Sequence, residues 1–591
     1  MSKRNEMNPE FQWDLSHIFA DADAWRAALA AAEEAVKALP ALRGTLTASA
    51  AALADGLDAI YAASERVELV YLWASLNKES DNSDPTYQEY EGMATGLYVR
   101  FSTAVSFADP EILSAGADTL RAYLAAEPRL ATYRFYIEDL IRSSAHVLDA
   151  QREEMLAALG DAARTPSDAY TMLTDVDLRF PPVVGDDGKE LPLTHGNFGV
   201  YRENQSRAVR EQAFENFLGT YKKFINTCAA TYAGAVKMDT FNATVRGFGS
   251  ACEAALSGGN VPVSVYDSLL TAIHDALPTM RKYIDLRARV MGKEQIDMFD
   301  LYVPMVEDVD YPMPYADAPS LVKAALEPFG PEYAALLDRA FSEHWIDVYE
   351  NEGKTTGAFS CGVYGVHPYV LLNYTDTLDD AFTLAHELGH AMHSYFSSTT
   401  QDYVNHDYRI MVAEVASTVN EVMLTKYLLA HETSPRRRAY ILNHFLEGFR
   451  TTVFRQTLFA EFERRAHEMY AAGQPLTAAS LSGLYKDLIS TYYEGAGIND
   501  VMQYEWAYIP HFYRGFYVYQ YATGFCSAVA IASHICETGD TAGYMKFLTL
   551  GGSDYPLEEL KVAGIDLTTP TPVANAMKVF DETIDELAAI L

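Results

Sequence analysis

Apolar residues recur with a helical period along most of the chain. From Asp21 to about Phe180, alanine, leucine and glutamate return every three to four positions with few glycine or proline breaks. We therefore expect a scaffold of antiparallel helices and a mainly α-helical fold. The predicted helices in this part of the chain are Ala24–Ala38, Ser49–Asn77, Pro85–Phe107 and Pro110–Leu124.

The helical pattern is interrupted near residue 185. Phe180–Lys189 contains two prolines, two glycines and an Asp-Gly pair between short extended stretches, which is typical of a small β-hairpin. Helical periodicity resumes at Ser206, and Ser320–Asp347 is again predicted to be helical. We predict two regions on this basis: an N-terminal helical lobe over 1–190 and a larger region over 191–591.

The residues before position 375 have a different composition, which does not follow the helical pattern. In Lys354–His367 glycine and small residues alternate with aromatic residues, and Pro368–Tyr374 is predicted to be a short β-strand. A glycine-rich strand lets another backbone approach closely, so an extended peptide could add to the edge of this small sheet. An ordinary hairpin is the alternative. The candidate peptide-binding residues are Gly357, Ala358, Phe359 and His367.

An H-E-x-x-H motif follows this predicted strand. Thr377 and Asp380 have the spacing of a capping box, which predicts that a helix begins here and carries the motif. On a helix His386 and His390 lie on one face, so both imidazoles can bind one zinc ion. Glu387 can then reach a water molecule on that ion without binding the metal itself. Two exposed histidines on an ordinary helix are the alternative.

A second helical stretch, Met411–Glu421, offers a third zinc ligand. Its polar residues form one stripe, because Glu414, Ser417, Thr418 and Glu421 are spaced at three, four and seven positions. A carboxylate on an otherwise apolar helix is costly to bury unless it is paired or bound to a metal. We predict Glu414 as the third ligand and Glu421 as an acceptor that orients a ligating histidine. The reverse assignment of these two residues stays open.

His393 competes with Glu414 for this role. Three ligands along one helix would spread over two turns, which closes poorly around a tetrahedral ion. The metzincin pattern requires a glycine three positions after the second histidine and a third histidine six positions after it. This chain has His393 and Phe396 at those positions, so the metzincin class is excluded.

Composition excludes several classes of partner. The 591 residues carry a formal net charge of −36, which repels phosphate backbones and anionic lipids, so we expect no nucleic-acid or membrane partner. The five cysteines are odd in number, widely spread and form no C-x-x-C pair, as in proteins of a reducing compartment. The N-terminus lacks an apolar signal region, and a cytoplasmic location is expected. A monomer is compatible with the sequence, which does not specify the oligomeric state.

These motifs resemble those of a known family. The stretches His386–His393, Val412–Ser417 and Phe454–Glu463 are similar to the thimet-oligopeptidase-like zinc metallopeptidases, most closely to the oligoendopeptidase F branch. The resemblance extends from Trp13 to the C-terminal helices. It implies a large two-lobed helical metallopeptidase with a deep substrate channel, a small β-sheet near the zinc helix, and a single zinc ion on the channel floor. Such a channel admits peptides rather than folded proteins.

The resemblance also implies roles for individual residues. Carried over to this sequence, His386, His390 and Glu414 are zinc ligands and Glu387 is the general base. A tetrahedral intermediate needs hydrogen-bond donors, and the resemblance implies that a histidine and tyrosines of the aromatic segment Ile509–Gly524 supply them. We assign His511 to this role, and packing in the core is the alternative for each tyrosine. The candidate tyrosines are Tyr517, Tyr519 and Tyr521.

The predicted function is that of a zinc-dependent endopeptidase that hydrolyses internal bonds of short unstructured oligopeptides, with one Zn²⁺ ion. One alternative is a zinc exopeptidase of the carboxypeptidase type, which would need a charged pocket for a chain end. The other is a non-catalytic helical protein that binds peptides and keeps a vestigial site. A structural zinc site would need a fourth protein ligand, and no cysteine has a suitable spacing.

Overall fold

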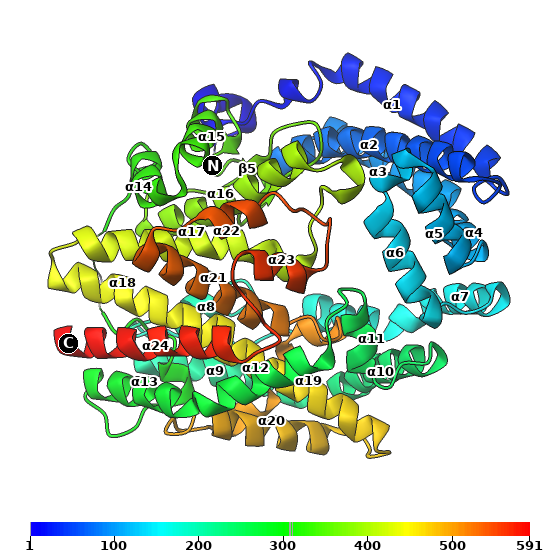
Figure 1. Ribbon diagram of the computed structural model, residues 1–591. Helices are drawn as coiled ribbons and strands as arrows, with labels where there is room; N and C mark the ends of the chain where they lie inside the picture. The colour runs from blue at the N-terminus through cyan, green and yellow to red at the C-terminus, as the bar shows by residue number, and fades with distance from the viewer. Residues whose placement is uncertain (1, 307–308, 310) are drawn as a thin grey trace. The chain divides into compact units, whose positions relative to one another are not determined.

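The computed structural model describes residues 2–306, 309 and 311–591 and consists mostly of helices (Figure 1). The predicted mainly α fold is therefore confirmed. The chain divides into two compact units, each drawn from three separate segments. The first unit comprises Met1–Ala145, Tyr311–Leu428 and Ile531–Ile565, and the second comprises His146–Asp310, Leu429–Ala530 and Asp566–Leu591. These units divide the chain differently from the predicted regions 1–190 and 191–591, and that single boundary stays a prediction.

The first unit contains two groups of helices and a small sheet. Its helices are α1 (Ala22–Ala38), α2 (Ala50–Ser80), α3 (Pro85–Val105), α4 (Ala108–Ser114), α5 (Ala117–Ala126), α6 (Arg134–Ser143), α14 (Ala318–Ala325), α15 (Pro331–Ser342), α16 (Leu378–Thr400), α17 (Ile410–His431, to residue 428), α22 (Ala542–Phe547) and α23 (Pro556–Val562). Its strands are β3 (Ile346–Asp347), β4 (Phe359–Cys361) and β5 (Tyr369–Leu371).

Side-chain caps fix where the N-terminal helices begin. Ser49 accepts a hydrogen bond from the Ala52 amide and starts α2, as the sequence predicts. The predicted helix Pro110–Leu124 is wrong, because the chain forms two helices, α4 and α5, in its place. Gly116 between them has φ +80°, a left-handed conformation that glycine adopts without strain and that ends the first helix.

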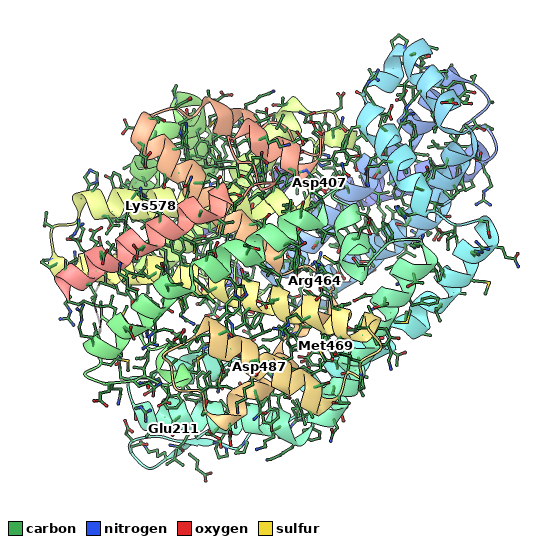
Figure 2. The ribbon with its side chains drawn as sticks, turned by 60° about the horizontal axis from the view of Figure 1, so that its bottom comes forward. Glu211, Asp407, Arg464, Met469, Asp487 and Lys578 are labelled. Atoms are coloured by element: carbon green, nitrogen blue, oxygen red, sulfur yellow. The ribbon has the colours of Figure 1, made fainter. Side chains whose placement is uncertain are left out.

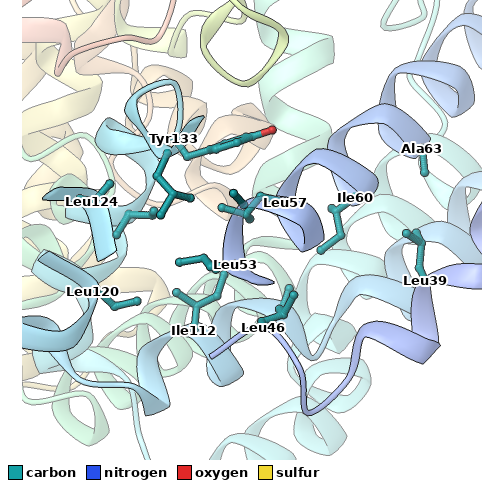
Figure 3. Close-up of a cluster of buried hydrophobic side chains, with 14 residues drawn as sticks. Leu39, Leu46, Leu53, Leu57, Ile60, Ala63, Ile112, Leu120, Leu124 and Tyr133 are labelled. Atoms are coloured by element: carbon teal, nitrogen blue, oxygen red, sulfur yellow. The ribbon is translucent and has the colours of Figure 1, made fainter. Parts of the chain in front are cut away.

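One apolar cluster holds α2, α4 and α5 together. Figure 3 shows Leu53 and Leu57 of α2 directed toward Ile112 and Leu120, with the ring of Tyr133 beside them. Leu53, Ile112 and Leu120 are completely buried. Truncating any one of these three side chains to alanine should therefore cost about 2–5 kcal/mol of stability.

The three-stranded sheet has the order β3-β5-β4, with β5 in the centre. β5 pairs in parallel with β3 and antiparallel with β4, so β4 lies at an edge of this sheet. Trp13 packs under it with Leu72, Leu76 and Tyr369, which ties the N-terminal segment to the sheet. Helix α16 packs against β4 and β5, and the predicted small sheet near the motif helix is confirmed.

The second unit is built from long helices and one small hairpin. Its helices are α7 (Ala150–Thr171), α8 (Phe198–Arg202), α9 (Arg207–Lys223), α10 (Ile225–Val245), α11 (Ala251–Ser257), α12 (Val263–Asp275), α13 (Leu277–Val290), α18 (Pro435–Gly448), α19 (Arg455–Ala471), α20 (Ala478–Tyr492), α21 (Tyr519–Thr538, to residue 530) and α24 (Thr571–Ile590). A π-helical turn, Phe449–Phe454, joins α18 to α19. Its strands are β1 (Val183–Val184) and β2 (Glu190–Leu191).

Both distant and consecutive helices of the sequence lie side by side in this unit. The C-terminal helix α24 packs on α13 and α18 (Figure 1), while α19 packs on α20. Figure 2 shows Arg464 and Met469 on α19 next to Asp487 on α20. The antiparallel pair β1–β2, with Gly188 at φ +79° in its turn, confirms the predicted hairpin.

Two other predictions can be compared with the structure. The predicted helix Ser320–Asp347 is wrong as one element, because α14 and α15 are separated at Gly330 and residues 346–347 form β3. Gly330 has φ +91°, which interrupts a continuous helix at this point. Within the part of the chain that the structure describes, no helix combines the length and apolar character needed to span a bilayer.

Candidate metal centre

Helix α16 places the two motif histidines on one face. Its first turn is closed by the predicted capping box, in which Thr377 accepts from the Asp380 amide and the Asp380 carboxylate accepts from the Thr377 amide. His386 and His390 stand one turn apart, with their Nε2 atoms 3.2 Å from each other. Both imidazoles are partly buried. Because the two residues lie on one face of the helix, their ring nitrogens converge on a single small volume.

Helix α17 can cross α16 closely because the motif contains a glycine. A Cβ atom at Gly389 would lie 2.5 Å from Ser417 Cα and 2.7 Å from the Ala416 carbonyl oxygen, both backbone atoms of α17. A buried bridge fixes the same crossing: Asn420 Nδ2 donates to the Ala385 carbonyl at 3.0 Å. Sequence reasoning missed both residues, although a glycine inside a motif helix and one asparagine off the polar stripe were visible signals.

This crossing brings Glu414 to the histidines. Its Oε2 atom lies 3.4 Å from His386 Nε2 and 3.4 Å from His390 Nε2. The three potential ligand atoms all lie within 4.8 Å of one another. The hydrogen bonds from the two imidazoles hold the pKa of the Glu414 carboxyl well below its usual range, so this residue is anionic at neutral pH.

The donor set fits a catalytic zinc ion. Two imidazoles and one carboxylate are ligands that zinc peptidases use, with the fourth position left for water or substrate. Among the described residues, no further histidine, cysteine, aspartate or glutamate joins His386, His390 and Glu414 in this group. The arrangement therefore suits an open, catalytic site rather than a closed, structural one.

Glu421 lies behind the first histidine. Its Oε1 atom forms a short hydrogen bond with His386 Nδ1, which leaves Nε2 of the same ring directed at Glu414. Burial lowers the pKa of His386, but the hydrogen bonds to Glu414 and Glu421 outweigh it and raise the pKa to about 10. A carboxylate in this position fixes the orientation and tautomer of a metal-binding imidazole.

Glu387 is buried beside the metal centre. The residue is only 7% exposed. Burial raises the pKa of its carboxyl above the usual value, although the neighbouring histidines lower it in part. A carboxylate with a raised pKa is a stronger base than an exposed one, as proton abstraction from water requires.

His393 occupies a different environment on the same helix. Its ring is 1% exposed and lies flat on Tyr408, with 3.8 Å between ring centroids and 2° between planes. It is not among the three residues whose ligand atoms converge. The geometry therefore favours Glu414 over His393 as the third ligand.

The predicted peptide-binding residues occupy two environments in the first unit. Phe359 lines a groove of about 820 Å³ between edge strand β4 and helices α2 and α3, and Gly357 and Ala358 lead into that strand. His367 is stacked on Trp345 at 4.7 Å and its Nε2 lies 2.8 Å from His17 Nδ1. Its contact with substrate stays a prediction.

The predicted oxyanion donors belong to the second unit. His511, Tyr517 and Tyr521 form one aromatic group: Tyr517 stacks parallel to His511, and the Tyr521 hydroxyl lies 3.4 Å from that of Tyr517. Tyr519 is 3% exposed and packs on Tyr266, as expected for a tyrosine that belongs to the core rather than to the site. The grouping favours Tyr517 and Tyr521 over Tyr519.

Comparisons with known proteins identify the family of this chain. A model described as peptidase family M3 matches residues 200–579, and one described as oligopeptidase F matches residues 111–180. The chain belongs to peptidase family M3. Over its full length it is 40% identical to oligopeptidase PepF of Bacillus subtilis, covering 88% of that protein, and 38% identical to an oligoendopeptidase F homolog of Lactococcus lactis subsp. lactis, covering 98% of it.

A solved structure supports the same assignment. Oligoendopeptidase-F from Enterococcus faecium matches with a TM-score of 0.75 and 36% sequence identity, over 96% of this chain and 98% of that one. The predicted resemblance and the predicted enzyme class, a metalloendopeptidase, are thus confirmed. The roles of individual residues in this M3 peptidase are the subject of the proposal that follows.

Proposed function

We propose that this M3 peptidase is a zinc-dependent endopeptidase that cleaves internal bonds of short, unstructured oligopeptides. One observation carries the proposal: His386, His390 and Glu414 converge within 4.8 Å, with Glu421 bonded to the far side of one imidazole. The names of the relatives, oligopeptidase and oligoendopeptidase, support the choice of substrate. A peptidase acting on oligopeptides is also what the matched oligopeptidase F model indicates.

The three ligands would hold the ion and leave one position open. Bound there, zinc would supply a Lewis acid that polarises the scissile carbonyl and lowers the pKa of water. Glu421 would keep the His386 ring in the orientation that exposes Nε2. Glu414→Ala is expected to lower the zinc content measured by elemental analysis. An unchanged zinc content would move the third ligand to another residue.

Glu387 would act as the general base. It accepts a proton from the attacking water and then donates it to the leaving amine, so the carboxylate is regenerated in each cycle. Its buried position beside the ligands keeps competing water away from this proton transfer. His511, Tyr517 and Tyr521 would donate hydrogen bonds to the oxyanion that forms when the carbonyl is attacked.

Edge strand β4 would bind the peptide backbone. An extended substrate can add to Gly357–Phe359 as a further strand, because β4 has a neighbour on one side only within the described sheet. The groove beside it gives side chains of the peptide a place to lie. A folded protein would have to unfold locally before it could pair in this way, which favours short unstructured substrates.

The remaining predictions concern the setting of the enzyme. All five cysteines are free, which supports a cytoplasmic location. We propose oligopeptides as the partners of this enzyme, and a monomer is compatible with the sequence.

Paired peptides test the function against its alternatives. Each peptide is prepared with free ends and with both ends blocked, and products are identified by mass spectrometry. Internal cleavage of both forms, abolished by phenanthroline and restored by zinc, is expected, and casein should stay intact. Cleavage that requires a free end would identify an exopeptidase. Absence of any cleavage by the zinc-loaded protein would identify a peptide-binding protein with a vestigial site.

A further inference from the structure

A cavity within the second unit has three arginines in its lining. Its volume is about 400 Å³, which is in the range of pockets that bind small molecules. Three arginines from three helical segments line it: Arg202 at the end of α8, Arg450 in the π-helical turn, and Arg455 at the start of α19. Nothing in the proposed peptidase mechanism uses these residues.

Tyr302 organises the three guanidinium groups. The guanidinium carbons of Arg202 and Arg450 lie 4.2 Å and 4.5 Å from the centre of its ring, and Arg455 Nη1 donates to its hydroxyl at 3.1 Å. Two like charges held against one ring, with a third at its edge, repel one another unless carboxylates or a bound anion compensate them.

The carboxylates nearby compensate only part of this charge. Glu447 accepts from Arg450 Nε at 2.8 Å and from the buried Arg287 at 3.0 Å, so one carboxylate serves two guanidinium groups. Glu505 accepts from Arg455 at 2.7 Å. Four arginines (Arg202, Arg287, Arg450 and Arg455) therefore face the carboxylates of the half-buried Glu447 and the buried Glu505. This leaves an excess of two positive charges, or one if the exposed Glu203 in the lining is included.

Buried hydrogen-bonding groups in the lining are also unused. Arg450 is 1% exposed, and its Nη1 atom has no hydrogen-bond partner among the described residues. The same holds for Arg202 Nε. A buried donor without a partner costs about 1–3 kcal/mol, so an anion that accepted hydrogen bonds from these two groups would recover that cost. Arg450 lies in a π-helical turn, a distortion that is frequent at functional sites.

We propose that this cavity binds a small oxyanion, a carboxylate or a phosphate, through Arg202, Arg450 and Arg455. Planar guanidinium groups donate two parallel hydrogen bonds to the oxygens of such groups, which chloride cannot receive in the same way. The three arginines make the lining unsuitable for a metal cation. Binding would neutralise the excess charge and stabilise the second unit against unfolding.

Calorimetric titration of the full zinc-loaded chain tests the proposal. The probes are sodium phosphate and sodium succinate, with sodium chloride holding the ionic strength constant. We expect saturable binding of at least one oxyanion, accompanied by a higher melting temperature. Phosphate alone would identify a phosphate site, and succinate alone a carboxylate site. Absence of saturable binding of both, or an equal response to chloride, would overturn the proposal.

Variants show where the anion binds. Arg202→Gln, at a partly exposed position, should weaken binding about tenfold, as the loss of one charge-assisted hydrogen bond implies. Arg450→Lys keeps the positive charge but loses the planar guanidinium that donates two parallel hydrogen bonds, so it should weaken binding as well. The matched control is Arg207→Gln, because Arg207 also stacks on an aromatic ring, Phe299 at 4.6 Å, outside the cavity lining.

Affinity that is unchanged in folded Arg202→Gln and Arg450→Lys would place the anion elsewhere, for example at the metal centre, and would overturn the proposal. Loss of affinity in the Arg207→Gln control to the same extent would do so too. The titration needs no peptide cleavage, so its outcome is independent of the proposed peptidase function.

Discussion

The two ends of the histidine run on α16 show how neighbours decide what an imidazole does. His386 faces two carboxylates of α17, and their hydrogen bonds raise its pKa to about 10. His393, two turns further along, faces Tyr408 and Phe547, and burial lowers its pKa to about 3. One residue type on one helix thus forms a polar end, where potential metal ligands converge, and a neutral, packed end.

The difference lies in the partner helix and not in the histidines. α17 presents Glu414 and Glu421 to the first end of the run, whereas the second end meets aromatic rings. A spacing rule that counts histidines along the sequence therefore cannot separate a ligand from a core residue. Four substitutions would break or sharpen this comparison, from the largest expected effect to the smallest.

Glu387→Gln tests the chemistry at the polar end. We expect kcat to fall by about 10³, since a positioned general base contributes about 10²–10⁴. Zinc content should stay the same, because Glu387 does not bind the metal in our proposal. Peptide hydrolysis and elemental analysis on the same preparation provide both numbers. Glu332→Gln, at an exposed position on α15, is the matched control. Parallel loss of zinc and turnover would show that Glu387 is a ligand.

Glu421→Gln tests the support behind His386. The amide is nearly isosteric but lacks the charge that orients the ring, so we expect zinc affinity to fall about 10–100-fold. Competition with a chelator of known affinity measures the change. His393 packs on Tyr408 and Phe547 and has no such carboxylate in the described structure, so no residue plays the part of Glu421 at the packed end. An unaltered zinc affinity would exclude the supporting role of Glu421.

Gly389→Ala tests the close crossing that separates the two ends. The new methyl group would lie 2.5 Å from Ser417 Cα, so α17 must move, and we expect a loss of about 1–3 kcal/mol in the free energy of unfolding. Zinc affinity should fall too, because Glu414 moves with α17. Urea denaturation measures the stability. Gly92→Ala in α3, where nothing lies within 4 Å of the new methyl group, should instead stabilise by about 0.5–1 kcal/mol. Equal effects of the two substitutions would contradict the crossing argument.

His393→Phe tests the packed end through its pH dependence. The folded-state pKa of His393 is about 3, below the 6.5 of the unfolded chain, so the unfolded state binds the proton between these values. The wild type therefore loses about 2 kcal/mol of stability at pH 5 relative to pH 8, a loss that His393→Phe should not share. Zinc content should be unchanged. Denaturation curves at the two pH values measure this, and a pH-independent difference between the variant and the wild type would show that His393 is accessible to protons.

Local signals in the sequence predicted much of this molecule. The structure confirms the predicted helix start at Ser49 and the predicted capping box at Thr377, because capping depends only on residues within one turn. The same reasoning failed between Pro110 and Leu124, where a single glycine at positive φ ends one helix and allows the next. The H-E-x-x-H motif could be placed on a helix for the same local reason.

The third ligand could be proposed from the sequence but not located. Glu414 is 24 residues from His390, and only the approach of α17 at Gly389 brings its carboxylate to the imidazoles. Tertiary packing likewise decides which tyrosine of the aromatic segment lies beside His511. It also brings three arginines of separate segments to one ring, that of Tyr302.

The amino-acid order alone determined the helical content and the H-E-x-x-H motif, since each depends on residues a few positions apart, and its resemblance to a known family indicated the class of enzyme. Tertiary structure decides which polar side chains meet across helices. That choice depends on burial and on close backbone contact between distant segments, and these forces act only once the chain has folded.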